Sequence, residues 1–395
     1  MSAGGASSRL ASSSVARLPG QATLPASSPG TTIRSPVEGI DVVACTIPTD
    51  APEADGTLAW DSTTIVVVRA HADGRTGLGY TYADASAAEL IRSKLADVVR
   101  GADALSPPAA WSAMQRALRN LGTESVAAMA VSALDTALWD LKARLLDLPL
   151  CDLLGVVHDS VPVYGSGGFT SYDEARLREQ LHGWVAQGIP RVKMKVGSEP
   201  AMDPLRVHAA RAAIGPNAEL FVDANGAYER KQALALACRF HGEDDVTWFE
   251  EPVSSQDLAG LRLLRDRAPA GMAIAAGEYA WRLADFEALL DAGAVDVLQA
   301  DVTRCGGITE LLRVDALCRA AQVPLSLHCA PALHAHPGTA LTQLVHLEWF
   351  HDHVRIEEML FDGRLAPRGG ALRPDRSRPG NGLELREEEA SRWAV

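Results

Sequence analysis

The sequence is short of basic residues and has no long apolar run. It has 37 Lys and Arg residues against 50 Asp and Glu residues, which gives a formal net charge of −13. This balance is unlike a nucleic-acid-binding surface or a polybasic membrane patch, so we expect no nucleic-acid partner. No apolar run approaches the roughly 20 residues that a membrane-spanning helix needs, so we expect no membrane partner either.

Cysteine is also scarce. The six cysteines are scattered, with no CxxC pair, at positions 45, 151, 238, 305, 318 and 329. This usage is typical of reduced core residues in a cytosolic protein, and not of a disulfide framework or a zinc site. We therefore expect a cytoplasmic protein. With 395 residues, 47% of them hydrophobic, the chain has room for two domains and a large core.

The first 33 or so residues contain no acidic residue and no continuous hydrophobic segment. They are rich in Ser, Ala, Gly and Pro, so a secretory signal is not expected. Their Arg and Ser content faintly resembles a transit peptide. We interpret residues 1–35 as a disordered extension.

The next part of the chain reads as an α+β module. Residues 39–47 and 62–70 are rich in β-branched residues and predict two strands, joined by a polar loop that contains Trp60. Helical periodicity follows at 86–100 and 109–121, and a longer pattern at 125–155 is interrupted by Pro149.

After residue 160, short apolar runs alternate with helical segments, which predicts a parallel sheet. Eight such runs at this spacing favour a (β/α) barrel, whose active site lies at the carboxyl ends of its strands. A doubly wound sheet is the alternative, but no GxGxxG motif follows the first strand. The predicted strands are 161–165, 191–197, 219–226, 246–253, 273–278, 295–302, 324–329 and 354–359.

Ionisable residues end six successive predicted strands. One such residue could be a helix cap, but six strand ends that converge on one barrel mouth are hard to explain by caps. They are Lys193 and Lys195, Asp223, Glu250, Glu278, Asp301 and His328.

The two lysines lie in the run RVKMKVG, residues 191–197. Because residues i and i+2 of a strand point to one face, Lys193 and Lys195 share a side. On an inner face they would need partners or a chemical role; an exposed edge strand is the alternative.

Three carboxylates on consecutive strands predict a metal site. Asp223, Glu250 and Glu278 would repel one another at one barrel mouth unless a cation neutralised them. Hard oxygen ligands without Cys or His favour Mg²⁺ over zinc. Strand alternation points Glu251 to the opposite side, where we expect a supporting or structural pairing.

Two bases are expected on either side of this cation. Asp301 and His328 can form a dyad in which the carboxylate fixes the imidazole tautomer. Lys195, close to Lys193 and a metal, should have a lowered pKa. This arrangement suits abstraction of a proton α to a carboxylate, because metal and ammonium charge would stabilise the enediolate.

These motifs resemble those of the enolase superfamily and, within it, the mandelate racemase subgroup. The resemblance extends from about residue 38 to beyond 360 and includes the helical segment 132–155. It rests on KMK (193–195), VDANG (222–226), FEEPV (249–253), AAGE (275–278), QADVTRCGGIT (299–309) and LSLH (325–328).

The resemblance implies an α/β fold, a modified TIM barrel (β/α)₇β with an α+β N-terminal capping domain completed by the C-terminal tail. We expect an extension at 1–35, the capping domain at 36–155, the barrel at 156–360 and the returning tail at 361–395. It also implies that the three carboxylates bind Mg²⁺ and that Lys195 and the His328–Asp301 pair are the acid/base groups. A lysine at position 301 would have indicated the muconate-lactonising branch of the family. Because this chain has Asp301, that branch is disfavoured.

Several further residues are candidates for substrate binding or catalysis, although a structural role is also open for them. Asn225 could bind a substrate oxygen or simply serve a turn. Glu348, just before the predicted eighth strand, matches a place where the family often keeps an acid facing the substrate; a helix-surface glutamate is the alternative. Trp60, Tyr80 and Tyr82 lie in segments, 49–61 and 79–84, that resemble specificity loops. The histidines 334, 336, 346, 351 and 353 are interpreted as mostly loop or surface residues.

We therefore predict a Mg²⁺-dependent lyase or isomerase with a small carboxylate substrate, most simply a dehydratase of an acid sugar. Racemisation or epimerisation of a 2-hydroxy acid is the first alternative and a sugar-lactone cycloisomerase the second. A non-catalytic barrel is disfavoured because no member of the constellation is missing. A homo-oligomer, from dimer to octamer, is expected.

Overall fold

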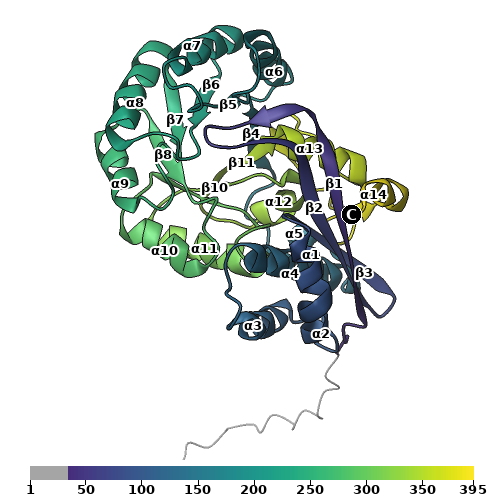
Figure 1. Ribbon diagram of the computed structural model, residues 1–395. Coiled ribbons are helices and arrows are strands. Elements are labelled where there is room, and N and C mark those ends of the chain that lie inside the picture. The colour runs from purple at the N-terminus through teal and green to yellow at the C-terminus, as the bar shows by residue number, and fades with distance from the viewer. Residues whose placement is uncertain (1–33) are drawn as a thin grey trace, which may run out of the picture. The chain divides into compact units, whose positions relative to one another are not determined.

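The computed structural model describes residues 34–395. The extension predicted at 1–35 therefore lies outside the described residues, except for its last two. The described part consists of an N-terminal α+β module, a barrel and a C-terminal segment (Figure 1).

The N-terminal module contains an antiparallel sheet in the order β1-β2-β3, made of Gly39–Ala54, Ala59–Ala72 and Arg75–Tyr82. The two predicted strands are present, but residues expected to form the loop between them instead extend β1 and β2 into a long hairpin. Pairing is irregular only between Pro48 and Glu53. The loop is thus reduced to a short tip at 55–58.

Strand β3 was not predicted, because two glycines weaken its strand signal. Packing explains them: a Cβ at Gly77 would lie 2.3 Å from the carbonyl oxygen of Ala137, and one at Gly79 would lie 2.3 Å from that of Ala133. Both carbonyls belong to α4 (Val126–Leu145), which packs directly on β3. The segment 79–84 is therefore mostly strand, and not the loop that the sequence suggested.

The helices of the module agree closely with the predicted pattern. The first prediction corresponds to α1 (Ser86–Leu90), the π-helical turn η1 (Ile91–Leu95) and α2 (Ala96–Val99). The second corresponds to α3 (Pro107–Leu118). The third pattern divides into α4 and α5 (Leu150–Leu154), with Pro149 at the N-terminus of α5.

Eight parallel strands form the barrel, which closes through pairing of the last strand with the first. Helices follow the strands on the outside (Figure 1). The strands are β4 (Val161–Gly167), β5 (Arg191–Lys195), β6 (Glu219–Asp223), β7 (Val246–Glu250), β8 (Ala273–Ala276), β9 (Val297–Ala300), β10 (Leu325–Leu327) and β11 (Leu344–Phe350). The helices are α6 (Glu174–Ala186), α7 (Asp203–Ile214), α8 (Arg230–Asp244), α9 (Leu258–Arg267), α10 (Leu283–Asp291), α11 (Ile308–Ala321) and α12 (Pro331–Gly338).

The prediction of the eighth strand at 354–359 was wrong. Those residues belong to α13 (His351–Leu360), and the eighth strand is β11. Within α13, Asp352, Ile356 and Leu360 are buried, a spacing of four that is helical and not strand-like. The correction places Glu348 on a barrel strand.

The C-terminal segment returns to the N-terminal module, as predicted. It contains β12 (Phe361–Asp362), β13 (Ala371–Leu372), β14 (Glu384–Leu385) and α14 (Glu387–Trp393). Strand β13 pairs with β4, and the backbone N–H of Val395 donates to Ala44 in β1. Over residues 34–395, no helix combines the length and the apolar character needed to cross a membrane. All six cysteines are free thiols, and Cys238 is the exposed one.

Candidate active site

The predicted strand-end residues meet at the carboxyl end of the barrel. Strand register explains part of this, since Lys195 pairs with Asp223 and Asp223 pairs with Glu250. All eight ionisable side chains are between 0 and 6% exposed: Lys193, Lys195, Asp223, Glu250, Glu278, Asp301, His328 and Glu348.

Three of these carboxylates form a compact cluster. Asp223, Glu250 and Glu278 each offer one oxygen, and these oxygens lie within 4.8 Å of one another. Glu278 reaches the cluster because Gly277 lets the chain pass close to β9: a Cβ there would lie 2.2 Å from the carbonyl oxygen of Gln299. The donor set is all oxygen, which suits a hard divalent cation.

Both lysines are ion-paired inside the barrel, so the exposed edge-strand alternative is wrong. Nζ of Lys193 lies 2.5 Å from Glu250 and 2.8 Å from Glu348. Nζ of Lys195 lies 2.5 Å from Asp223 and donates to Oδ1 of Asn225 at 3.1 Å.

The pKa of Lys195 is raised, and not lowered as we expected. Burial and the neighbouring Lys193 ammonium lower it, but the carboxylates of Asp223, Glu278 and Glu250 together outweigh them. The expectation was wrong for the protein chain alone because it counted the nearby positive charges and omitted the direct ion pair with Asp223. A divalent cation that shares Asp223 would weaken this pair.

Asp301 and His328 form the expected pair across neighbouring strands. Oδ2 of Asp301 lies 2.8 Å from Nδ1 of His328, and Oδ1 accepts bonds from the N–H and hydroxyl of Thr303 at 2.7 Å each. Burial would raise the pKa of Asp301, but the bond with His328 and the charges of His328 and Arg304 together outweigh burial and lower the pKa. Asp301 therefore stays a carboxylate that orients the imidazole.

The other ring nitrogen of His328 faces the carboxylate cluster. Nε2 lies 3.1 Å from Oε2 of Glu278, at an ion-pair distance but without hydrogen-bond geometry. Oε2 of Glu278 thus has no hydrogen-bond partner among the described residues, which fits an oxygen that binds a cation. Arg304 also approaches Glu278, with Nη1 3.6 Å from Oε1.

Glu348 lies inside the barrel, so the helix-surface alternative is wrong. It is 1% exposed on β11, and its Oε1 pairs with Lys193. Its Oε2 accepts from the backbone N–H of Cys329 at 3.1 Å. Burial would raise the pKa of Glu348, but the charge of Lys193 and then of His328 lower it.

Glu251 is buried, but the supporting or structural pairing that we expected is not found among the described residues. It has a left-handed backbone with φ of 38°, and its Oε1 has no hydrogen-bond partner among residues 34–395. Burial and then the charge of Glu278 raise its pKa. Glu251 is therefore a buried acid without a compensating cation of its own among the described residues, and it lines a cavity other than the one that contains Lys195 and His328.

A cavity of about 450 Å³ opens above these groups. Lys195, Glu278, His328, Glu348 and the three predicted substrate-binding residues line it. Trp60 donates to Glu53 at 2.9 Å, and Tyr82 stacks on His353 with ring centroids 3.4 Å apart. The β1–β2 hairpin thus supplies part of the cavity wall.

Some assignments from the sequence need correction. Tyr80 does not line the cavity but is fully buried and donates to Glu357. Four of the histidines interpreted as loop or surface residues are buried: His334, His336, His346 and His353. Burial lowers the pKa of His353 to about 3, so this ring is neutral.

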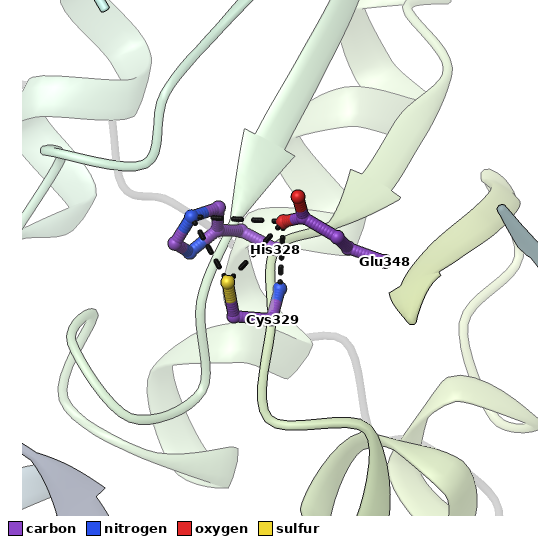
Figure 2. Close-up of side chains that lie close together, drawn as sticks. All are labelled: His328, Cys329 and Glu348. Atoms are coloured by element: carbon purple, nitrogen blue, oxygen red, sulfur yellow. Dashed lines mark hydrogen bonds and ion pairs between the residues drawn. The ribbon is translucent and has the colours of Figure 1, made fainter. Parts of the chain in front are cut away.

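Two cavity residues were not singled out from the sequence. Arg304 lies inside the quoted QADVTRCGGIT motif and approaches both Glu278 and Asp301. Cys329 directly follows His328, and its Sγ lies 3.3 Å from that imidazole and 3.3 Å from Glu348 (Figure 2). The sequence signal that could have identified them is their position: Arg304 lies within one family motif, and Cys329 directly follows another.

Two family models match the chain. The one described as Enolase C-terminal domain-like matches residues 176–390, and the Mandelate racemase / muconate lactonizing enzyme, N-terminal domain matches residues 41–155. The chain belongs to the mandelate racemase/muconate lactonizing enzyme family. This family membership confirms the resemblance to the enolase superfamily that the motifs indicated, and with it the barrel and its N-terminal module.

Relatives of this family member include a 3,6-anhydro-alpha-L-galactonate cycloisomerase from Streptomyces coelicolor, 33% identical over 90% of this chain and 98% of that protein. The crystal structure of a mandelate racemase/muconate lactonizing enzyme-like protein from Rubrobacter xylanophilus is 63% identical, covers 91% of this chain and 100% of that chain, and has a TM-score of 0.90. The structure of the L-talarate/galactarate dehydratase from Salmonella typhimurium LT2 liganded with Mg and L-lyxarohydroxamate is 27% identical, covers 95% and 97% of the two chains, and has a TM-score of 0.85.

Proposed function

We propose that the protein is a Mg²⁺-dependent dehydratase of an acid sugar, which removes the proton α to the substrate carboxylate and expels a β-hydroxyl group. The observation that carries this proposal is the cavity itself. Lys195 at the end of β5 and His328 directly after β10 line it beside three clustered carboxylates. Two proton-transfer groups and a cation site beside one cavity suit the formation of an enediolate.

The residues that would hold Mg²⁺ are Asp223, Glu250 and Glu278. Their oxygens are buried and clustered, and Oε2 of Glu278 has no hydrogen-bond partner among the described residues. When bound, Mg²⁺ supplies positive charge to the substrate carboxylate, in which negative charge grows as the α-proton leaves. The bound magnesium of the L-talarate/galactarate dehydratase structure supports this choice of cation.

We assign the proton transfers to Lys195 and His328. Lys195 takes the α-proton on its side of the substrate, and Lys193 contributes a buried positive charge next to it. His328 donates a proton from Nε2 to the leaving hydroxyl group, because Asp301 holds its Nδ1. Glu348 keeps Lys193 in place through Oε1.

Substrate binding is assigned to the side chains that line the cavity away from the carboxylate cluster. Asn225 presents an amide beside Lys195, and Trp60 and Tyr82 form apolar walls with polar edges. These groups suit a polyhydroxylated acid, whose hydroxyl groups need hydrogen bonds while its carbon chain needs a shaped wall.

A sugar-lactone cycloisomerase is the second candidate, and the relative from Streptomyces coelicolor favours it. Racemisation or epimerisation of a 2-hydroxy acid uses the same two bases without a leaving group. Dehydration removes one water from the substrate, whereas cycloisomerisation and racemisation leave the mass unchanged.

The test is a substrate screen of hexarates, hexonates, pentonates and sugar lactones in the presence of Mg²⁺. Mass spectrometry should detect loss of one water from at least one acid sugar, and the Lys195→Ala variant is the control. A product of unchanged mass from a lactone would favour the cycloisomerase instead. Absence of both turnover and α-proton exchange in heavy water, for every compound, would contradict an enzyme of this class.

We also propose a homo-oligomer, from dimer to octamer, and a cytoplasmic location. The free thiols of all six cysteines support a reducing compartment. The division into a capping domain at 36–155, a barrel at 156–360 and a tail stays a prediction. Light scattering of the purified protein would measure the number of subunits.

A further inference from the structure

Three different ligand groups meet at one edge of the cavity: an imidazole, a thiol and a carboxylate (Figure 2). Sγ of Cys329 lies 3.3 Å from Nε2 of His328 and 3.3 Å from Oε2 of Glu348. Nε2 of His328 lies 3.6 Å from the same carboxylate oxygen. All three side chains are nearly fully buried.

These distances fit a single tetrahedral cation. Zinc binds sulfur at about 2.3 Å and nitrogen or oxygen at about 2.0–2.1 Å, so neighbouring ligand atoms of a tetrahedral site lie roughly 3.3–3.6 Å apart. The three observed separations fall in that range. No side chain would have to move far to coordinate such an ion.

The surroundings orient each ligand atom toward the others. The bond from Nδ1 of His328 to Asp301 leaves Nε2 as the ring nitrogen that can bind a cation, and Nε2 also lies 3.1 Å from Oε2 of Glu278. Lys193 holds Oε1 of Glu348, which leaves Oε2 beside the thiol. Supporting contacts of this kind are typical of protein metal sites.

We propose that His328, Cys329 and Glu348 form a second cation site, which takes a thiolate-binding divalent cation such as Zn²⁺ or Cd²⁺. The thiol of Cys329 gives up its proton to solvent as the sulfur–metal bond forms, and Nε2 of His328 binds through its lone pair. The fourth position faces the cavity and is left to water. The all-oxygen cluster of Asp223, Glu250 and Glu278 keeps its preference for Mg²⁺, because hard and soft ligands separate the two ions.

The sequence gives no sign of this site, because a histidine–cysteine pair directly after β10 and a glutamate on β11 form no recognisable metal spacing. A cation bound at this site would block Nε2 of His328, the nitrogen that we assign to proton transfer. Binding of the cation should therefore inhibit the enzyme. Only that inhibitory effect rests on the proposed function. Binding itself can be tested without turnover.

The test is a Cd²⁺ titration of the full chain in excess Mg²⁺, followed by the ultraviolet charge-transfer band of a cadmium–thiolate bond. We expect a band that saturates at one equivalent and persists when Mg²⁺ is raised. Cys329→Ser should abolish the band. Cys238→Ser is the matched control, because Cys238 is the exposed thiol that adventitious Cd²⁺ would reach, and this variant should keep it.

Two further variants test the other ligands while the thiol stays in place. Glu348→Gln and His328→Asn should each weaken Cd²⁺ binding by at least on the order of tenfold, as loss of a metal contact does. Circular dichroism checks that each variant is folded. A band that survives Cys329→Ser, disappears in Cys238→Ser, or is unaffected by both ligand variants would overturn the proposal, even if the dehydratase assignment holds.

Discussion

Nδ1 of His328 donates a hydrogen bond to Oδ2 of Asp301 across 2.8 Å, between side chains that follow two neighbouring parallel strands. Because an ionised carboxylate only accepts, the proton of this bond belongs to the imidazole. Nε2 is therefore the nitrogen that faces the cavity. This relationship separates an acid/base dyad from a lone histidine and can be tested directly.

The variant Asp301→Asn should lower turnover by on the order of a hundredfold or more, because an amide no longer fixes the tautomer or supports the imidazolium charge. Removing the carboxylate lowers the pKa of His328, so the histidine limb of the pH–rate profile should move to lower pH. The exchange of the α-proton through Lys195 should change much less. The measurement is a pH–rate profile together with proton exchange in heavy water.

Thr303→Val is the matched control, because it removes a hydroxyl bond to Asp301 without touching the imidazole. It should leave the histidine limb in place. Equal loss of both proton-transfer activities in Asp301→Asn, or an unmoved limb, would mean that Asp301 is a structural acid at the strand end.

Lys195→Ala and His328→Asn should each abolish turnover, since each removes one of two proton-transfer groups, and such groups contribute on the order of a hundredfold or more. Each variant should still exchange the substrate α-proton on the side served by the remaining base. Nuclear magnetic resonance in heavy water can follow this exchange. If exchange proceeds at the wild-type rate in the double variant, neither residue is the base.

Glu278→Gln should weaken Mg²⁺ binding by at least on the order of tenfold and lower activity with it, because it removes one of three negative charges at the cation site. The fold should survive, since the change also relieves repulsion among buried carboxylates. Titration calorimetry measures the affinity. Glu251→Gln is the control, because we place this buried neighbour outside the ligand set, and near-normal affinity is expected. A reversed result would exchange the two assignments.

The barrel could be predicted because its strands repeat at an even spacing and end in ionisable residues. The eighth strand was misplaced because Val354, Ile356 and Met359 resemble the apolar positions of a short strand, and only burial at every fourth position identifies the helix α13. Strand β3 was missed because Gly77 and Gly79, which let α4 approach, remove its strand signal.

The site was predictable where neighbouring strands alone decide which side chains meet, as for Asp223 and Glu250. It was less predictable where direct contacts decide the chemistry. The pKa of Lys195 depends on the ion pair with Asp223, and the role of Cys329 depends on a residue of the next strand. Strand register brings Lys195 beside Asp223, but spacing along the chain encodes neither the direct ion pair between them nor the contact of Cys329 with Glu348.

A buried acid outside the catalytic groups gives a prediction about stability. Glu53 is fully buried on β1, and its Oε1 has no hydrogen-bond partner among the described residues, while Oε2 accepts from Trp60. Burial and then the charge of Asp352 raise the pKa of Glu53 from 4.5 to about 8, although Trp60 and Arg355 oppose the shift.

Between pH 4.5 and about 8, the folded protein therefore holds a proton on Glu53 that the unfolded chain releases. Stability from this group is full below the lower pKa and is lost as pH rises through the higher one. The neutral variant Glu53→Gln keeps an acceptor for Trp60 and should lack this loss. As pH rises through this range, the free energy of unfolding of Glu53→Gln, measured with urea, should increase relative to that of the wild type by a few kcal/mol. One pKa unit corresponds to about 1.36 kcal/mol. Glu388→Gln, at an exposed position on α14, should follow the wild type at every pH. If Glu53→Gln also ran parallel to the wild type, Glu53 would be ionised in the folded protein and its burial would need another partner.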